Sequence, residues 1–230
     1  MLVEWNTNVQ DRKFVASYSG GKDSSLALYK AIQMGEAIAL IVMLEEQGQK
    51  SRSHGMSLDI IHAQAKAIGL PIYSASATWQ DYENQFIQLL QKAQSLGAET
   101  LVTGDIDLMA HAEWNQSVCD KTELSLCMPL WQRPRLDVVH EFIRLGFQSI
   151  IVTVNLNLGM TVEDLGQVLS LEYVNELVAR GIDPCGEAGE FHTTVIDGSI
   201  FKHPLSVVNG DILYHENYAF LPLELEQRDI

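Results

Sequence analysis

The segment Ser19–Ser24 reads Ser-Gly-Gly-Lys-Asp-Ser and combines residue types that suit a phosphate group. Its two glycines let the backbone approach an anion closely, and successive N–H groups form a concave nest for it. Lys22 adds a positive charge, and Asp23 is placed to hold Mg²⁺ beside the phosphates. A helix that begins here would add unpaired N–H groups and the positive end of its dipole. The alternative is a Ser/Gly turn capped by Asp23.

The same segment does not match two better-known phosphate loops. A Walker A loop has a glycine five positions before its last glycine and Ser or Thr after its lysine, whereas this chain has Ala16 and Asp23 there. The GxGxxG pattern also fails, because residues 22–25 supply no third glycine. A P-loop kinase, a GTPase and a dinucleotide-binding enzyme are therefore disfavoured.

A second segment, 186–193, packs two carboxylates and an imidazole into a short stretch, in Glu187, Glu190 and His192. If the chain is extended from Glu190 to Thr194, alternate side chains share one face, so Glu190, His192 and Thr194 point together. Such a group could orient ammonia, accept a proton or ligate a metal. The alternative is a tight turn with solvated carboxylates and a hydrogen-bonded histidine.

The elements around these segments alternate between strand and helix as far as residue 130. The continuous apolar run Ala37–Leu44 is typical of a strand that is covered on both faces of a parallel sheet. Further strands are expected at 14–16, 72–75 and 101–103, with helices near 28–35, 61–68 and 86–96. This rhythm predicts an α/β domain, 1–130, followed by a smaller α+β domain, 131–230. In the second domain, Asn209-Gly210 between two apolar runs predicts a hairpin.

Composition limits the partners. The formal net charge is −15 and the pI is about 4.7, a field that disfavours nucleic-acid partners. No apolar run reaches the ~20 residues of a membrane-spanning helix, and the first residues lack a signal-peptide pattern. Three cysteines without a CxxC pair suit a reduced compartment. We expect a soluble cytoplasmic protein with no membrane partner, its oligomeric state open and a homodimer included.

The Ser19–Ser24 loop resembles the pyrophosphate-binding loop of the N-type ATP pyrophosphatases, or PP-loop superfamily, which includes GMP synthetase and tRNA thiolases. The resemblance implies a doubly wound parallel sheet of the adenine nucleotide alpha hydrolase-like, HUP type. It also implies ATP and Mg²⁺ as cofactors, with transfer of AMP to a substrate oxygen. In that strand order the loops after the first and fourth strands face each other, which adds Gly104-Asp105 to the site. The nucleotide contacts implied are Ser19, Gly20, Gly21, Lys22, Asp23, Ser24, Gly104 and Asp105, with Asp23 as the metal ligand.

A narrower resemblance rests on the spacing of several further motifs. Val102–Ile106, Pro129–Trp131, Gly146-Phe147 and 186–193 followed by Asp197 and Phe201 are together similar to the diphthine–ammonia ligase family, also called ATP-binding domain 4. The likeness covers roughly residues 14–201. It implies adenylation of a carboxylate and attack by ammonia, with a C-terminal domain that forms the substrate cleft. Lys22, Glu187, Glu190 and His192 are then the catalytic residues.

Several alternatives stay open at this stage. His54 follows the second strand and is either an adenine or substrate contact or a surface loop histidine. Residues 107–114 lack the arginine-rich pattern of the family, and fewer cations there would weaken recognition of an anionic or nucleic-acid partner. If the chain is bacterial, its substrate is not diphthine, and the chemistry carries over better than the substrate. The rival functions are a PP-loop tRNA-modifying enzyme and an ATP-binding sensor without turnover.

Overall fold

The computed structural model describes residues 9–51 and 55–226. By their contacts these residues form two compact units, each described here by itself. The first unit contains residues 9–19, 23–51 and 70–133, and the second contains residues 20–22, 55–69 and 134–226. The division of the chain at residue 130 stays a prediction about domains.

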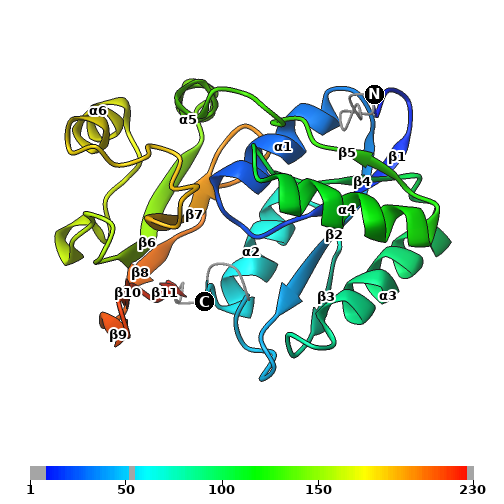
Figure 1. Ribbon diagram of the computed structural model, residues 1–230, viewed down its shortest axis with the longest axis horizontal. Helices are drawn as coiled ribbons and strands as arrows, with labels where there is room; N and C mark the ends of the chain where they lie inside the picture. The colour runs from blue at the N-terminus through cyan, green and yellow to red at the C-terminus, as the bar shows by residue number, and fades with distance from the viewer. Residues whose placement is uncertain (1–8, 52–54, 227–230) are drawn as a thin grey trace. The chain divides into compact units, whose positions relative to one another are not determined.

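The first unit is built on five parallel strands in the order β3-β2-β1-β4-β5 (Figure 1). This order reverses direction between β1 and β4, so the doubly wound fold expected from the sequence is confirmed. Strand β5 was not anticipated, because its three residues are too short to show a pattern. The strands are β1 (Lys13–Ser17), β2 (Glu36–Leu44), β3 (Ile72–Ser76), β4 (Thr100–Val102) and β5 (Ser125–Cys127).

Helices α3 (Tyr82–Ser95) and α4 (Met109–Thr122) lie side by side against this sheet (Figure 1). Their apolar stripes pack with the sheet in one core cluster, to which Phe86 and Leu90 contribute from α3. Residues 40–44 of β2 are all buried, as expected for a strand covered on both faces. Helix α1 (Lys22–Ile32) follows β1 directly, so the glycine segment is the connection between them.

The second unit is a mixture of helices and antiparallel strands, which confirms the α+β expectation. Its main sheet has the order β7-β6-β10-β9, and a separate pair joins β11 to β8. Helix α2 belongs to this unit and ends at Gly69, whose φ of 87° is a left-handed cap. The helices are α2 (Leu58–Ile68), α5 (Arg135–Arg144) and α6 (Leu171–Ala179), with a 3₁₀ turn at Val162–Asp164. The strands are β6 (Gln148–Asn155), β7 (Phe191–Asp197), β8 (Val207–Asn209), β9 (Leu213–His215), β10 (Tyr218–Phe220) and β11 (Leu223–Leu225).

The hairpin predicted at Asn209-Gly210 is wrong. Strand β8 pairs with β11 instead of the residues that follow Gly210, and the Gly210 N–H donates to the Pro222 carbonyl at 2.8 Å. The hairpin of this region lies between β9 and β10, where Glu216 adopts a φ of 52° in the two-residue turn. The turn signal at Asn209-Gly210 was local, whereas the pairing followed the burial of Leu223 against the rest of the unit.

None of the described helices has both the length and the apolar content needed to cross a membrane.

Candidate active site

The glycine segment begins where β1 ends, and its shape depends on Gly20. Gly20 has a φ of 81°, a left-handed conformation that side chains with a Cβ rarely adopt. A Cβ at this position would lie 2.4 Å from Gln64 Oε1 and 2.9 Å from Met56 Sδ. The residue is therefore required to be glycine both by its backbone angle and by its neighbours.

Within the first unit, Gly104 lies against the start of α1. A Cβ on Gly104 would meet the carbonyl carbon of Asp23 and the nitrogen of Ser24, each at 2.8 Å. The Ser19 and Ser24 hydroxyls also bond each other at 3.1 Å. The loops after β1 and β4 are thus neighbours, as the strand order predicts.

Asp105, which follows Gly104, has both carboxylate oxygens in hydrogen bonds. Oδ1 contacts His111 Nδ1 at 3.0 Å, and Oδ2 accepts from Asn115 Nδ2 at 2.8 Å. Burial alone would raise the pKa of Asp105, but the hydrogen bonds from His111, Thr103 and Asn115 outweigh it and lower that pKa. Asp105 is therefore a fixed negative charge at the end of β4.

Within the second unit, residues 20–22 are bonded to strand β7. The Val195 N–H donates to the Gly20 carbonyl at 3.0 Å, and the Lys22 N–H donates to Thr193 Oγ1 at 3.2 Å. From α2, Gln64 Nε2 donates to the same Gly20 carbonyl at 2.9 Å. The backbone of this segment is therefore held at two points.

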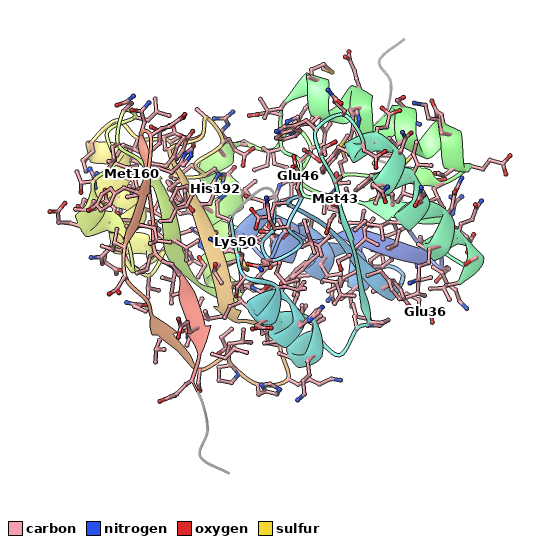
Figure 2. The ribbon with its side chains drawn as sticks, turned by 90° about the horizontal axis from the view of Figure 1, so that it is seen from below. Glu36, Met43, Glu46, Lys50, Met160 and His192 are labelled. Atoms are coloured by element: carbon pink, nitrogen blue, oxygen red, sulfur yellow. The ribbon has the colours of Figure 1, made fainter. Side chains whose placement is uncertain are left out.

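The Lys22 side chain lies close to the residues that begin β7. Its Nζ is 6.0 Å from the centre of the Phe191 ring, and only 5% of the residue is exposed. The next residue, His192, is half-buried on the same strand (Figure 2). Burial and then the positive charge of Lys22 lower the pKa of His192 to about 4. The imidazole is consequently neutral at pH 7.

Asp183 organises the acidic segment that precedes β7. Its side chain forms an ion pair with Arg135 at the start of α5 and accepts the N–H groups of Cys185 at 3.0 Å and Glu187 at 3.2 Å. Further along, Glu190 is 8% exposed and its Oε2 accepts the Ala188 N–H at 3.0 Å. Asp183 thus holds the backbone at Cys185 and Glu187, while Glu190 is bonded to Ala188 of its own segment.

Models of the diphthamide synthase family match nearly the whole chain. The N-terminal domain model matches residues 12–126, and the C-terminal domain model matches residues 134–228. The chain belongs to the diphthamide synthase family. The junction between the two matches lies near the end of the first unit.

The chain is also similar in sequence to several curated proteins named diphthine–ammonia ligase. The human protein is 26% identical, with 92% of this chain and 88% of that protein aligned. The rat protein is 25% identical over the same shares. The protein of Schizosaccharomyces pombe is also 25% identical over 89% of this chain, but the chain spans only 38% of its length.

One solved structure is a more distant match to this chain. The predicted subunit of a tRNA methyltransferase from Methanocaldococcus jannaschii aligns with 82% of this chain and 98% of its own, at 16% identity and a TM-score of 0.44. A likeness this distant does not bear on the function.

A Mg²⁺ ion could bind at this site only if the bound nucleotide supplied some of its ligands. Within the described part of the chain, no group of three or more His, Cys, Asp or Glu side chains is arranged to hold a metal ion. Asp23, in the first turn of α1, can supply one carboxylate. The other ligands would be phosphate oxygens and water, which is how Mg²⁺ usually binds in nucleotide sites.

The predicted site residues fall into two groups, one in each unit. Within the first unit, Asp23 and Ser24 lie beside Gly104, which Asp105 follows. Within the second unit, residues 20–22 lie beside the strand that carries His192, while Glu187 and Glu190 contact their own segment. His54 lies outside the described residues.

Sequence reasoning about this family member missed three residues that hold the segments in place: Gln64, Asp183 and Arg135. Gln64 gave a signal, because it is a polar residue in the apolar stripe of a helix between Ile61 and Ile68. Asp183 and Arg135 gave none, because a charged residue outside an apolar pattern reads as surface.

Proposed function

We propose that this protein is an ATP-dependent amide ligase that activates a carboxylate as an acyl-adenylate and transfers it to ammonia, with release of AMP and pyrophosphate. One observation of the second unit supports this most directly. The phosphate-binding residues 20–22 are bonded to β7, the strand that carries His192 and directly follows Glu190. Groups suited to a phosphate and groups suited to amide chemistry thus occur in one unit.

In the first half-reaction, a carboxylate oxygen of the substrate attacks the α-phosphorus of ATP. The bond between the α-phosphorus and its bridging oxygen breaks, and pyrophosphate leaves with that oxygen. Lys22 has the charge to neutralise the leaving group as its negative charge grows. Lys22 is only 5% exposed, and low exposure to water strengthens the effect of its charge on nearby phosphate oxygens. Mg²⁺ at Asp23 would supply further neutralisation of the phosphates.

In the second half-reaction, the ammonia nitrogen attacks the acyl carbon. A C–N bond forms, the bond from the acyl carbon to AMP breaks, and the nitrogen loses a proton. Glu190 is suited to receive it, because a carboxylate also stabilises the positive charge that builds on the nitrogen. With a pKa of about 4, His192 is a weak base at pH 7, and we assign it a hydrogen-bonding role.

The substrate class follows from this chemistry as a carboxylate on a protein side chain or a small molecule. The relatives' names make diphthine the first candidate. Leu108 and Met109, in the segment without the family's arginines, are 40% and 48% exposed. We therefore propose that this stretch favours a less anionic partner.

Thiol chemistry of the kind that tRNA thiolation requires finds little support in the cysteines. Burial raises the pKa of Cys119 to about 12 and that of Cys127 to about 11. Cys185 is buried, and its thiol donates to the Arg135 carbonyl at 3.0 Å. Protonated, buried thiols are poor nucleophiles.

Product analysis tests the proposal. Purified protein is incubated with ATP, Mg²⁺, ammonium and a panel of carboxylates that begins with elongation factor 2 carrying diphthine. We expect AMP and pyrophosphate in equal amounts over many turnovers only when both carboxylate and ammonium are present, and at most one pyrophosphate per enzyme without ammonium. ATP binding without AMP formation across the panel would identify a sensor instead.

Two variants test the roles within the site. Lys22→Ala should lower AMP formation by about 100-fold or more, the usual cost of losing one transition-state charge contact. Lys30→Ala, at the other end of the same helix, is the matched control and should keep normal activity. Glu190→Gln should bind ATP normally and slow the attack by ammonia. If Glu190→Gln lowered the ATP affinity by as much as it slowed the attack by ammonia, its assigned role would be contradicted.

A further inference from the structure

Gln64 is a polar side chain buried among apolar neighbours on α2. The residue is fully buried, and Ile60, Ile61, Ala65 and Ile68 of the same helix are buried with it. A primary amide in such a place is unfavourable unless its polar atoms are hydrogen-bonded. Its presence calls for a specific contact that compensates for burial.

The contacts of Gln64 are made by one end of its amide. Nε2 donates to the Gly20 carbonyl at 2.9 Å and to the Val195 carbonyl at 2.7 Å. Oε1 is buried and has no hydrogen-bond partner among the described residues. Leaving an acceptor unsatisfied destabilises the fold. The contribution of this side chain therefore comes from its two donors, both directed at backbone carbonyls.

These donors set the orientation of one peptide group in the glycine segment. The Gly20 carbonyl accepts from Gln64 and from the Val195 N–H at 3.0 Å. Because the peptide bonds are trans, the carbonyl of Gly20 and the N–H of Gly21 point in opposite directions. Fixing the carbonyl toward α2 and β7 thus also fixes the direction in which the Gly21 N–H points.

The side chains of Gln64 and Met56 also pack closely against Gly20. Gln64 Oε1 occupies the place where a side chain on Gly20 would begin, only 2.4 Å from the position of an added Cβ. Met56 Sδ closes the same place at 2.9 Å. The neighbours of Gly20 therefore leave no room for a side chain at this position.

We propose that Gln64 is a positioning residue for the pyrophosphate-binding segment, acting through the Gly20 carbonyl. This inference rests on the proposed function, in which residues 20–22 bind the β- and γ-phosphates of ATP. Gln64 touches no ligand in this role. Its loss weakens binding of pyrophosphate and ATP and leaves binding of AMP, which lacks those two phosphates, unchanged.

Calorimetry with ATP, pyrophosphate and AMP, each with Mg²⁺, tests this role. Gln64→Met keeps the length of the side chain and removes both donors. We expect the affinities for ATP and pyrophosphate to fall by about tenfold, the factor for one lost interaction of ~1.4 kcal/mol, while the AMP affinity stays the same. An unchanged pyrophosphate affinity, or an equal loss for AMP, would overturn the role.

Thr122→Val is the matched control for general destabilisation. Thr122 is also buried, and its hydroxyl donates to two backbone carbonyls, those of Val118 at 2.9 Å and Cys119 at 3.2 Å. It lies in α4 and belongs to the first unit, whereas residues 20–22 belong to the second. This variant should lose stability without a selective loss of pyrophosphate binding.

Thr193→Val provides a second route if Gln64→Met does not fold. It removes the acceptor of the Lys22 N–H with little change in shape, and it should produce the same selective loss. Wild-type protein that binds no pyrophosphate would overturn both this inference and the proposed function. Gln64-dependent pyrophosphate binding without amide formation from any carboxylate would overturn the proposed function alone.

Discussion

Two segments of the second unit carry the proposed chemistry, and they are built in opposite ways. Residues 20–22 are held through their backbone, by Val195, Thr193 and Gln64. The acidic segment from Asp183 to Glu190 is held through the Asp183 side chain, which accepts two N–H groups and pairs with Arg135. The first segment presents a shaped backbone and one lysine, whereas the second presents side chains.

The difference follows from what each segment would bind. A phosphate is recognised by several N–H groups at once, so the backbone that carries them has to be rigid and free of side chains. Amide chemistry needs individual carboxyl and imidazole groups, and these can be carried by a turn whose backbone is fixed elsewhere. A substitution that disturbs the backbone should therefore impair the first segment most, and one that removes a side chain should impair the second.

The largest effect is expected from a methyl group in the first segment. In Gly20→Ala, the new Cβ combines a φ of 81° with a contact of 2.4 Å to Gln64 Oε1. We expect ATP affinity to fall by about 100-fold, which corresponds to ~3 kcal/mol of strain and overpacking. Binding measured by calorimetry and stability measured by urea unfolding check this expectation.

Gly189→Ala is the control from the acidic segment. Gly189 has a φ of 88°, but nothing lies within 4 Å of an added Cβ. This variant should lose ~1 to 2 kcal/mol of stability from backbone strain and bind ATP normally. Equal losses of ATP affinity in the two alanine variants would show that φ alone matters and that the packing around Gly20 does not.

A smaller effect is expected from removing the side chain that holds the acidic segment. Asp183→Ala breaks the ion pair with Arg135 and leaves the N–H groups of Cys185 and Glu187 without their acceptor. We expect a loss of ~2 kcal/mol of stability and about a tenfold slower transfer to ammonia, with ATP affinity unchanged. Single-turnover kinetics with preformed acyl-adenylate would measure the transfer step.

Asp197→Ala is the matched control for this substitution. Asp197 is half-buried on β7, and its Oδ1 accepts the adjacent Gly198 N–H at 2.8 Å. Its removal should leave the transfer step unchanged. If Asp183→Ala weakened ATP binding more than it slowed transfer, the separation between the two segments would be wrong.

The smallest effect is expected from His192 on β7. The pKa of His192 is about 4 in the folded protein and near 6.5 in the unfolded chain, so the unfolded chain binds more protons between these values. Stability should therefore fall as the pH falls from 6.5 to 4. The loss should be roughly 1.5 kcal/mol, because the half-buried ring keeps part of its hydration.

His192→Gln tests this expectation, since glutamine does not titrate. Urea unfolding of both proteins at pH 7 and pH 4.5 should show a steeper loss in the wild type. A parallel pH dependence would mean that neither burial nor Lys22 holds the imidazole neutral, and His192 would again be a candidate base.

Much of the fold could be predicted from local patterns. The glycine that ends α2, the buried run of β2 and the alternation of strand and helix follow from residue spacing, and the structure confirms them (Figure 2 labels Glu36 and Met43 toward the two ends of β2). The pairing of β8 with β11 could not be predicted, because the local turn signal at Asn209-Gly210 competes with burial of a strand 14 residues later.

The sequence by itself determined the family and predicted a phosphate-binding role for Ser19–Ser24, because residue types at fixed spacing carry both. Only the tertiary structure decided that the Gln64 amide faces Gly20 and that the His192 imidazole is neutral. Hydrogen bonds between residues 44 positions apart, and the desolvation that shifts a pKa, depend on which elements pack together. No local pattern of residues contains that information.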